Sequence, residues 1–172
     1  LRNLARIRHD RKSFIPFLYC RALVRPGMRR TPGRTLLFYG ALTERRKRIL
    51  ERLESAGVPV EVVFGEYDRA RDARMSRAWA VLNLHKTDDL AVFEPIRCFY
   101  PLINGVPVIS EAVENDATAA PFHDAMLFFE GAALGERIKH LYDHTETFEA
   151  ETARRIARFA ETSGKSEIAA AA

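Results

Sequence analysis

The chain has few cysteines and no long apolar segment. Only two of its 172 residues are cysteine, Cys20 and Cys98, and they lie far apart without a CxxC or other metal-ligand spacing. This excludes a disulfide framework and a cysteine-based zinc site, so we expect a reducing compartment. No apolar run approaches the roughly 18 residues that span a bilayer, and the first residues lack a signal-peptide pattern. We therefore predict a cytoplasmic protein without a transmembrane segment, with peripheral membrane association left open.

Several common catalytic signatures are also missing. The sequence has no P-loop, no GxGxxG and no Ser-His-Asp arrangement. His123, His140 and His144 have no spacing to Asp or Glu that predicts a metal site, so we expect no bound metal. A receiver domain needs clustered acidic residues after its first strand to hold Mg²⁺, and residues 39–41 lack them.

Positive charge is concentrated at the start of the chain. Ten of the 27 Lys and Arg residues lie in residues 1–34, together with only one of the 23 acidic residues, Asp10. The net charge of +4 therefore comes from this basic arm. A basic arm can contact nucleic acid or anionic lipid, and nucleic-acid binding would depend steeply on salt. Aromatic residues are not interleaved with the charges as in single-strand binders, so a solvated linker or strap is favoured and nucleic acid is an unlikely partner.

The rest of the chain alternates apolar runs with amphipathic segments. Apolar runs predict buried strands at residues 35–40, 58–65, 79–84, 106–110 and 125–131. Helices are predicted at 42–57, 66–78 and 93–104, followed by one or two helices over 133–162. Thr43 is the expected N-cap of the first helix, and Gly57 its stop. Pro95 suits a first turn, whereas Pro101 should kink or shorten its helix.

This alternation predicts an α/β fold. Five β-α units with uniformly apolar strands indicate a doubly wound, mainly parallel five-stranded Rossmann-like sheet with helices on both faces. We divide the chain into a basic N-terminal arm or linker at 1–34, a Rossmann-like domain at 35–165 and a frayed tail at 166–172.

Polar residues follow the predicted strands at one edge of this sheet. His85 ends the third strand, Glu94 and Arg97 open the next helix, and Glu111 closes the fourth strand. In an open α/β sheet, ligands bind beyond the carboxyl ends of the strands, because loops and helix N-termini converge there. The sequence therefore predicts a binding site at this edge.

The order and spacing of four segments resemble a known family. LLFYGALTERRKRIL, the strand ending LNLH, FEPIR and NGVPVISE together look like the C-terminal, nucleotide-sugar-binding half of GT-B glycosyltransferases of the group 1 or 4 type, over about residues 35–160. The resemblance implies a hexosyltransferase-like enzyme whose C-terminal domain holds a nucleotide-diphosphate sugar as co-substrate, without a cofactor or metal. It also implies an acceptor-binding N-terminal domain that is missing from this chain, so the chain alone would bind donor without transferring sugar to its unknown acceptor.

The resemblance implies donor-binding roles for Arg45 and Lys47, which follow the first strand where family members place basic residues near the diphosphate. A diphosphate needs cations or a helix N-terminus to balance its charge. Arg46 is the third basic residue of this group, but a helix turns roughly 100° per residue, so all three cannot face one ligand. The family's glutamate pair, separated by seven residues, is absent, because Leu102 stands eight positions after Glu94. The catalytic residue is therefore unknown.

The other candidates each have two interpretations. Glu94 can accept ribose hydroxyls or simply complement the dipole of its helix, and Arg97 can reach the ligand or pair with Glu94. His85 can bind a phosphate or sugar oxygen, or cap its strand. Glu111 can bind a sugar hydroxyl or serve as a loop carboxylate, and Asn83 is interpreted as bonding buried backbone. The alternative to a glycosyltransferase donor domain is a non-catalytic flavodoxin-like interaction module.

Overall fold

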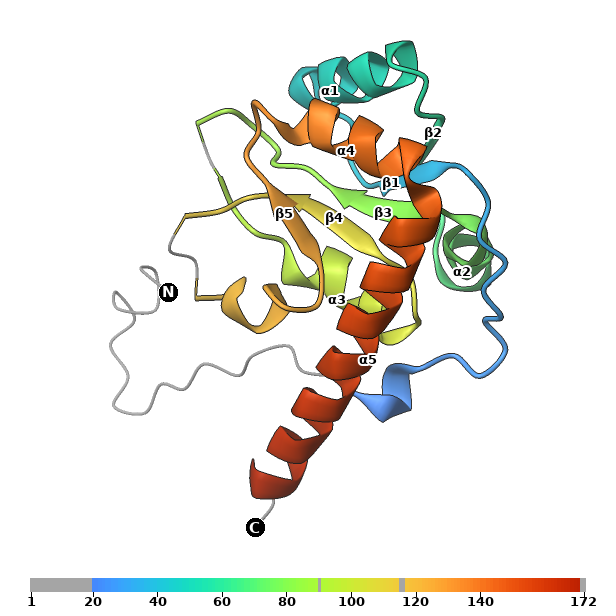
Figure 1. Ribbon diagram of the computed structural model, residues 1–172, viewed down its shortest axis with the longest axis vertical. Coiled ribbons are helices and arrows are strands. Elements are labelled where there is room, and N and C mark those ends of the chain that lie inside the picture. The colour runs from blue at the N-terminus through green and yellow to red at the C-terminus, as the bar shows by residue number, and fades with distance from the viewer. Residues whose placement is uncertain (1–19, 90, 115–116, 171–172) are drawn as a thin grey trace.

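In the computed structural model, which describes residues 20–89, 91–114 and 117–170, a five-stranded sheet forms the centre of the domain (Figure 1). Its strands are β1 (Leu36–Tyr39), β2 (Val60–Val63), β3 (Ala80–Asn83), β4 (Val108–Glu111) and β5 (Leu127–Phe129). They are ordered β2-β1-β3-β4-β5, and every pairing is parallel. The predicted five-stranded parallel α/β fold is confirmed.

Helices cover both faces of the sheet. Helices α1 (Glu44–Ser55) and α4 (Leu134–Asp143) pack on one face, and α2 (Asp68–Arg77) and α3 (Pro95–Ile103) on the other. Successive strand residues point to opposite faces, so Leu36 and Phe38 join one core and Leu37 joins the other. The long helix α5 (Thr145–Ala170) contributes to both cores, through Phe148 and Phe159.

The sequence located the elements better than their ends. All five strands are shorter than predicted, because only part of each apolar run is paired in the sheet, and β4 ends one residue later than predicted. Thr43 caps α1 as expected, since its Oγ1 accepts a hydrogen bond from the Arg46 N–H at 3.3 Å. Two short 3-10 helices, η2 (Arg21–Leu23) and η3 (Ala120–Phe122), were not predicted. Helix α5 continues through Ala170 and so includes residues 166–170 of the expected tail.

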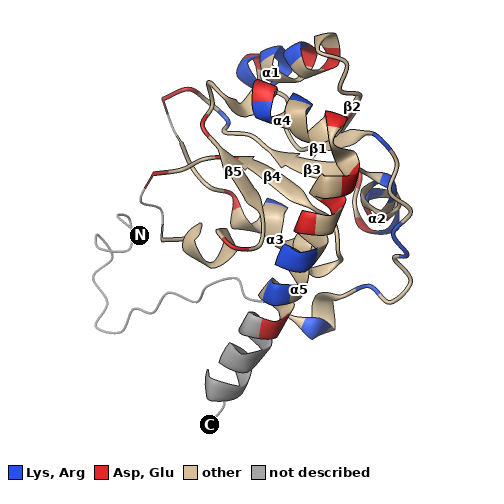
Figure 2. Cartoon of the chain, viewed as in Figure 1, with Lys and Arg blue, Asp and Glu red and all other residues tan. Residues whose placement is uncertain are grey.

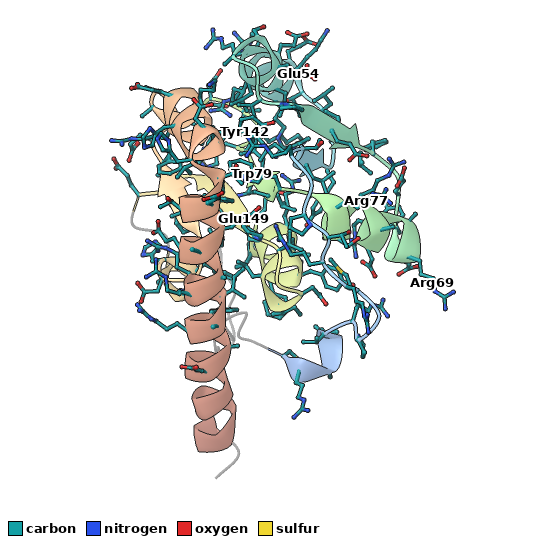
Figure 3. All side chains as sticks on the ribbon, turned by 45° about the vertical axis from the view of Figure 1, so that its right-hand side comes forward. Glu54, Arg69, Arg77, Trp79, Tyr142 and Glu149 are labelled. Atoms are coloured by element: carbon teal, nitrogen blue, oxygen red, sulfur yellow. The ribbon has the colours of Figure 1, made fainter. Side chains whose placement is uncertain are left out.

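Trp79 anchors the last helices to the sheet. It directly precedes β3, is fully buried, and lies beside Tyr142 of α4 in Figure 3. The ring centroids of Trp79 and Tyr142 are 5.3 Å apart in an edge-on arrangement. The ring centroid of Phe148 on α5 lies 4.3 Å from that of Trp79. Such aromatic contacts fix the packing of α4 and α5 at the amino end of β3.

The described part of the basic arm is a strap bound to the amino ends of the strands. Arg30 donates hydrogen bonds to the carbonyl oxygens of Gly105, Ala78 and Trp79, which precede β4 and β3. Burial lowers the pKa of Arg30 to about 10. Arg34 binds the Tyr142 carbonyl oxygen at 2.8 Å. These arginines hold the strap in place, whereas residues 1–19 of the predicted arm lie outside the described residues.

Charged residues lie mainly on the helices and loops, and the strands are largely uncharged (Figure 2). Among the described residues, no helix combines the length and apolarity that crossing a bilayer requires.

Replacing Arg30 with alanine should destabilise the domain. The substitution leaves three backbone carbonyls at the strap without their donor, and hydrogen bonds to a charged group contribute roughly 1.5–3 kcal/mol each before relaxation and solvent access reduce the total. We expect the free energy of unfolding, measured by urea denaturation, to fall by about 2 kcal/mol. The neighbouring variant Arg29→Ala changes an exposed side chain and should lower it by less than about 0.5 kcal/mol. Equal losses in both variants would show that Arg30 does not tie the strap to the sheet.

Candidate functional site

The carboxyl edge of the sheet contains a hollow beside the end of β1. After β1 the chain enters α1 on one face, and after β3 it enters α3 on the opposite face, so the neighbouring strands β1 and β3 form the topological switch point. The hollow has a volume of about 520 Å³ and lies between this point, α2 and the start of α3. It is lined by Tyr39, Gly40, Arg71, Phe93, Glu94, Pro95, Ile96 and Arg97.

Arg46 is the buried centre of this edge. Only 2% of its side chain is exposed, although it belongs to the first turn of α1. Its guanidinium donates to the carbonyl oxygens of Leu84 at 2.6 Å, His85 at 3.2 Å and Ala41 at 2.9 Å. It also donates to Glu94 Oε1 at 2.9 Å. Arg46 therefore joins the segments that follow β1 and β3 to the start of α3.

Glu94 is shared by two arginines. Its Oε1 accepts from Arg46, and its Oε2 lies 2.8 Å from Arg97 Nη2. The carboxylate is 38% exposed, whereas the exposed fractions of Arg46 and Arg97 are 2% and 10%. The pKa of Arg46 is lowered, first by burial and then by repulsion from Arg97. The single carboxylate of Glu94 thus pairs with two largely buried arginines, so this cluster has an excess of positive charge.

Gly40 allows Arg97 to approach the end of β1. Gly40 has φ +124°, and a Cβ atom built there would lie 2.7 Å from Arg97 Nη2. Only glycine combines this backbone conformation with so close a contact. Arg97 Nη1 also points at the Asn83 side-chain oxygen, 3.4 Å away. The guanidinium of Arg97 is therefore held between β1 and β3.

Pro101 supports the same site from inside α3. The sequence predicted that it would kink or shorten the helix, and α3 runs through it and ends at Ile103. Proline has no N–H for the carbonyl four residues earlier, which is that of Arg97. The Tyr39 hydroxyl donates to this carbonyl oxygen at 2.6 Å instead. Burial raises the pKa of Tyr39, so the hydroxyl keeps its proton.

Arg45 and Glu111 form a second cluster, in which carboxylates pair with Arg45 on two sides. Arg45 donates to both carboxylate oxygens of Glu111, at 2.9 and 2.6 Å, and also to Asp88. The pKa of Arg45 is raised, chiefly by its hydrogen bond to Glu111. Glu111 is almost fully buried and also accepts the backbone N–H of His85 at 2.6 Å. This cluster fixes the ends of β3 and β4 to α1.

His85 lies between the two clusters. Its side chain is 8% exposed, and Nδ1 lies 3.8 Å from Glu111 Oε2. Its Nε2 is buried without a hydrogen-bond partner among the described residues. The pKa of His85 is lowered, mainly by burial, although Glu111 opposes the shift. The neutral ring is therefore favoured, with one nitrogen available to a ligand or a water molecule.

The structure brings five of the six predicted site residues to this edge: Arg45, His85, Glu94, Arg97 and Glu111. Lys47 is half-exposed on the surface of α1, where its Nζ lies 3.9 Å from Glu51. The interpretation of Asn83 was wrong, because its side chain donates to the Ser110 hydroxyl at 2.9 Å instead of bonding backbone.

Two arginines of the edge were not selected from the sequence. Arg46 was considered with its neighbours, but its helical position alone did not distinguish it from Arg45. Arg71 belongs to α2, a helix that contains charges of both signs, and it lines the hollow. The only sequence signal for Arg71 is its distance of one turn from the start of that helix.

We found no candidate metal site in the described part of the chain. No group of three or more His, Cys, Asp or Glu side chains is arranged there to hold an ion.

Comparison with known proteins gives distant relatives. No family model matches the chain. It is similar to three proteins of Acanthamoeba polyphaga mimivirus that are named uncharacterized proteins. It is 35% identical to L137 over 77 residues, which cover 44% of this chain and 10% of L137. For L138 the identity is 32% over 75 residues, covering 43% of this chain and 8% of L138.

The third relative, L140, matches a longer segment. It is 26% identical over 134 residues, which cover 74% of this chain and 44% of L140. The chain therefore spans a tenth or less of the first two relatives and less than half of the third.

Arg46 should contribute strongly to stability and Lys47 only weakly. Replacing Arg46 with methionine removes the side-chain donor of the Leu84 and Ala41 carbonyl oxygens and one of the two arginine partners of Glu94. Removing one partner of a buried ion pair costs roughly 3–5 kcal/mol. Because Glu94 is partly exposed, we expect a loss of about 3 kcal/mol in the free energy of unfolding. Lys47→Met removes only a surface ion pair and should change it by less than about 1 kcal/mol. A similar small effect for both variants would contradict the buried role of Arg46.

His85 should make the domain less stable below neutral pH. Its folded pKa lies below the ordinary value of 6.5, so the unfolded chain binds more protons as the pH falls below that value. The contribution of neutral His85 is complete above pH 6.5 and is lost as the pH falls through the lower pKa of the folded state. Between pH 7.5 and pH 5.5, the free energy of unfolding measured by urea denaturation should fall less for His85→Gln than for the wild type. His123→Gln, which changes an exposed residue, should behave as the wild type.

Proposed function

We propose that this domain binds a nucleotide-diphosphate sugar and forms the donor-binding half of a glycosyltransferase. The observation that carries the proposal is the cluster in which Arg46 and Arg97 share Glu94 at the mouth of the hollow. Its excess positive charge suits a diphosphate, and a carboxylate can accept hydrogen bonds from two hydroxyl groups. The position at the switch point of the sheet also favours nucleotide binding.

The residues have different proposed roles. Glu94 accepts hydroxyl groups of the ribose or of the sugar, and Arg97 faces the diphosphate together with the first turn of α3, whose dipole favours an anion. The buried Nε2 of His85 has no hydrogen-bond partner among the described residues, and we propose that it bonds a phosphate or sugar oxygen of the bound ligand. Arg45 and Glu111 bond each other, so we assign them to holding His85 in place more than to direct contact. Lys47 remains a weaker candidate for the diphosphate because it lies on the helix surface.

The proposed chemistry is displacement at the anomeric carbon of the sugar. An acceptor hydroxyl oxygen forms the new bond to this carbon, the bond to the diphosphate oxygen breaks, and a nucleoside diphosphate leaves. Positive groups in the hollow stabilise the charge that grows on this leaving group. The hydroxyl proton goes to a base in the acceptor-binding domain, which we propose to belong to a longer protein.

A non-catalytic flavodoxin-like interaction module is the second candidate. The strand order β2-β1-β3-β4-β5 is that of flavodoxin-like folds. Exposed apolar side chains also surround the carboxyl edge, among them Leu42, Phe64, Tyr67 and Ile96. Such residues can bind a protein partner. This candidate predicts no response to nucleoside diphosphates.

Calorimetric titration with UDP, GDP, ADP and their common sugar conjugates tests the donor site. We expect one nucleotide series to bind to the wild type, and Glu94→Gln to weaken it about tenfold or more, because a neutral amide accepts hydroxyl hydrogen bonds less strongly than a carboxylate. The matched control is Glu61→Gln: Glu61 is 32% exposed and paired with Arg74 at 2.6 Å, but lies outside the hollow. Equal affinities for both variants, or no binding to the wild type, would refute the donor-site proposal.

A further inference from the structure

Arg71 is a cation of the hollow whose charge no described carboxylate neutralises. Its side chain has no hydrogen bond or ion pair to another described residue, and its buried Nε has no partner. The other arginines of this edge differ from it: Arg45 is paired with Glu111 and Asp88, and Arg46 and Arg97 share Glu94. A buried guanidinium N–H without a partner is costly, so it calls for an acceptor.

Neighbouring side chains hold Arg71 in position. Its guanidinium carbon lies 4.9 Å from the centre of the Tyr100 ring of α3. The Tyr100 hydroxyl donates to Asp72 on α2 at 2.9 Å and accepts from Arg25 of the strap at 3.0 Å. Tyr100 is therefore a fixed platform between α2 and α3, and a guanidinium stacked on an aromatic ring keeps its donors free for a planar oxyanion.

The residues that line the hollow indicate which kind of ligand the anion belongs to. Arg71 and Arg97 provide two positive charges, and Glu94 is the one acidic residue among the described lining residues. Phe93, Pro95 and the largely exposed Ile96 add apolar surface beside them. A volume of about 520 Å³ accommodates an organic molecule and exceeds the needs of a single inorganic ion.

We propose that Arg71 binds a phosphate group of the ligand in this hollow, opposite Arg97, and so completes a diphosphate site formed by α2 and α3. The inference rests on the proposed function for the identity of the ligand, and it adds a second arginine to Arg97 as a diphosphate contact. Arg71 donates hydrogen bonds from its guanidinium to the phosphate oxygens, while the apolar wall contacts the rest of the ligand.

Binding of inorganic pyrophosphate and of UDP, GDP and ADP to three variants tests this inference. Arg71→Met keeps a long apolar side chain beside Tyr100 and removes the charge, so we expect diphosphate affinity to fall about 10- to 100-fold. Arg71→Lys keeps the charge without the planar fork and should bind with intermediate affinity. The control is Arg69→Met on the same helix. Arg69 is exposed, points away from the domain in Figure 3 and does not line the hollow, so this variant should bind as the wild type.

The outcomes separate this inference from the proposed function. Pyrophosphate binding that depends on Arg71, with no further gain from any nucleoside or sugar, supports the diphosphate site and refutes the sugar-donor function. Nucleotide-sugar binding that requires Glu94 but is unchanged in Arg71→Met supports the function and refutes the role of Arg71. Absence of diphosphate binding to the wild type refutes both. If Arg71→Met does not fold, as judged by thermal unfolding, wild-type affinity in Arg71→Lys still overturns the inference, because a lysine cannot reproduce the guanidinium contacts.

Discussion

The buried guanidinium of Arg46 is the interaction on which the rest of the carboxyl edge depends. It is almost completely shielded from solvent, and it donates hydrogen bonds to the carbonyl oxygens that follow β1 and β3 at the switch point of the sheet. Burying a cation so deeply is unfavourable unless it is paired, and this requirement fixes Glu94 at the start of α3. Arg97 then shares Glu94, and its close approach requires glycine at position 40. The geometry of the site thus follows from one buried charge.

The division of charge between two clusters gives the edge its chemical character. In the cluster around Glu111, Arg45 forms ion pairs with the carboxylates of Glu111 and Asp88. In the cluster around Glu94, arginine exceeds carboxylate, and the excess faces a hollow. A phosphate-containing ligand would satisfy the arginines of the cluster around Glu94 in the way that Glu111 satisfies Arg45. This contrast explains why we propose a ligand beside Glu94 and assign a positioning role to Arg45.

The sequence predicted the fold and the edge but not the partners. Apolar runs and their separation were sufficient for the parallel sheet, since strands buried on both faces must be uniformly apolar. Because the carboxyl ends of parallel strands lie at the same edge of a sheet, the sequence also predicted that His85, Glu94 and Glu111 lie at one edge. It could not choose between the adjacent arginines of α1, because both lie near the edge and only packing decides which is buried. The place of Pro101 inside α3 could not be predicted, because the Tyr39 hydroxyl that bonds the Arg97 carbonyl oxygen comes from a distant strand. Arg71 was missed for a similar reason, since the Tyr100 platform that holds it belongs to another helix.

Mapping backbone amide chemical shifts by NMR during titration with a nucleoside diphosphate tests the central claim most directly. The account predicts that the largest shifts occur at Gly40, Arg71 and Ile96, which surround the hollow at the switch point. A separate hollow is lined by Arg45, Arg48 and Arg52, among others, and is one competing anion site. Shifts centred on Arg48 and Arg52, with Gly40 and Ile96 unchanged, would contradict the account.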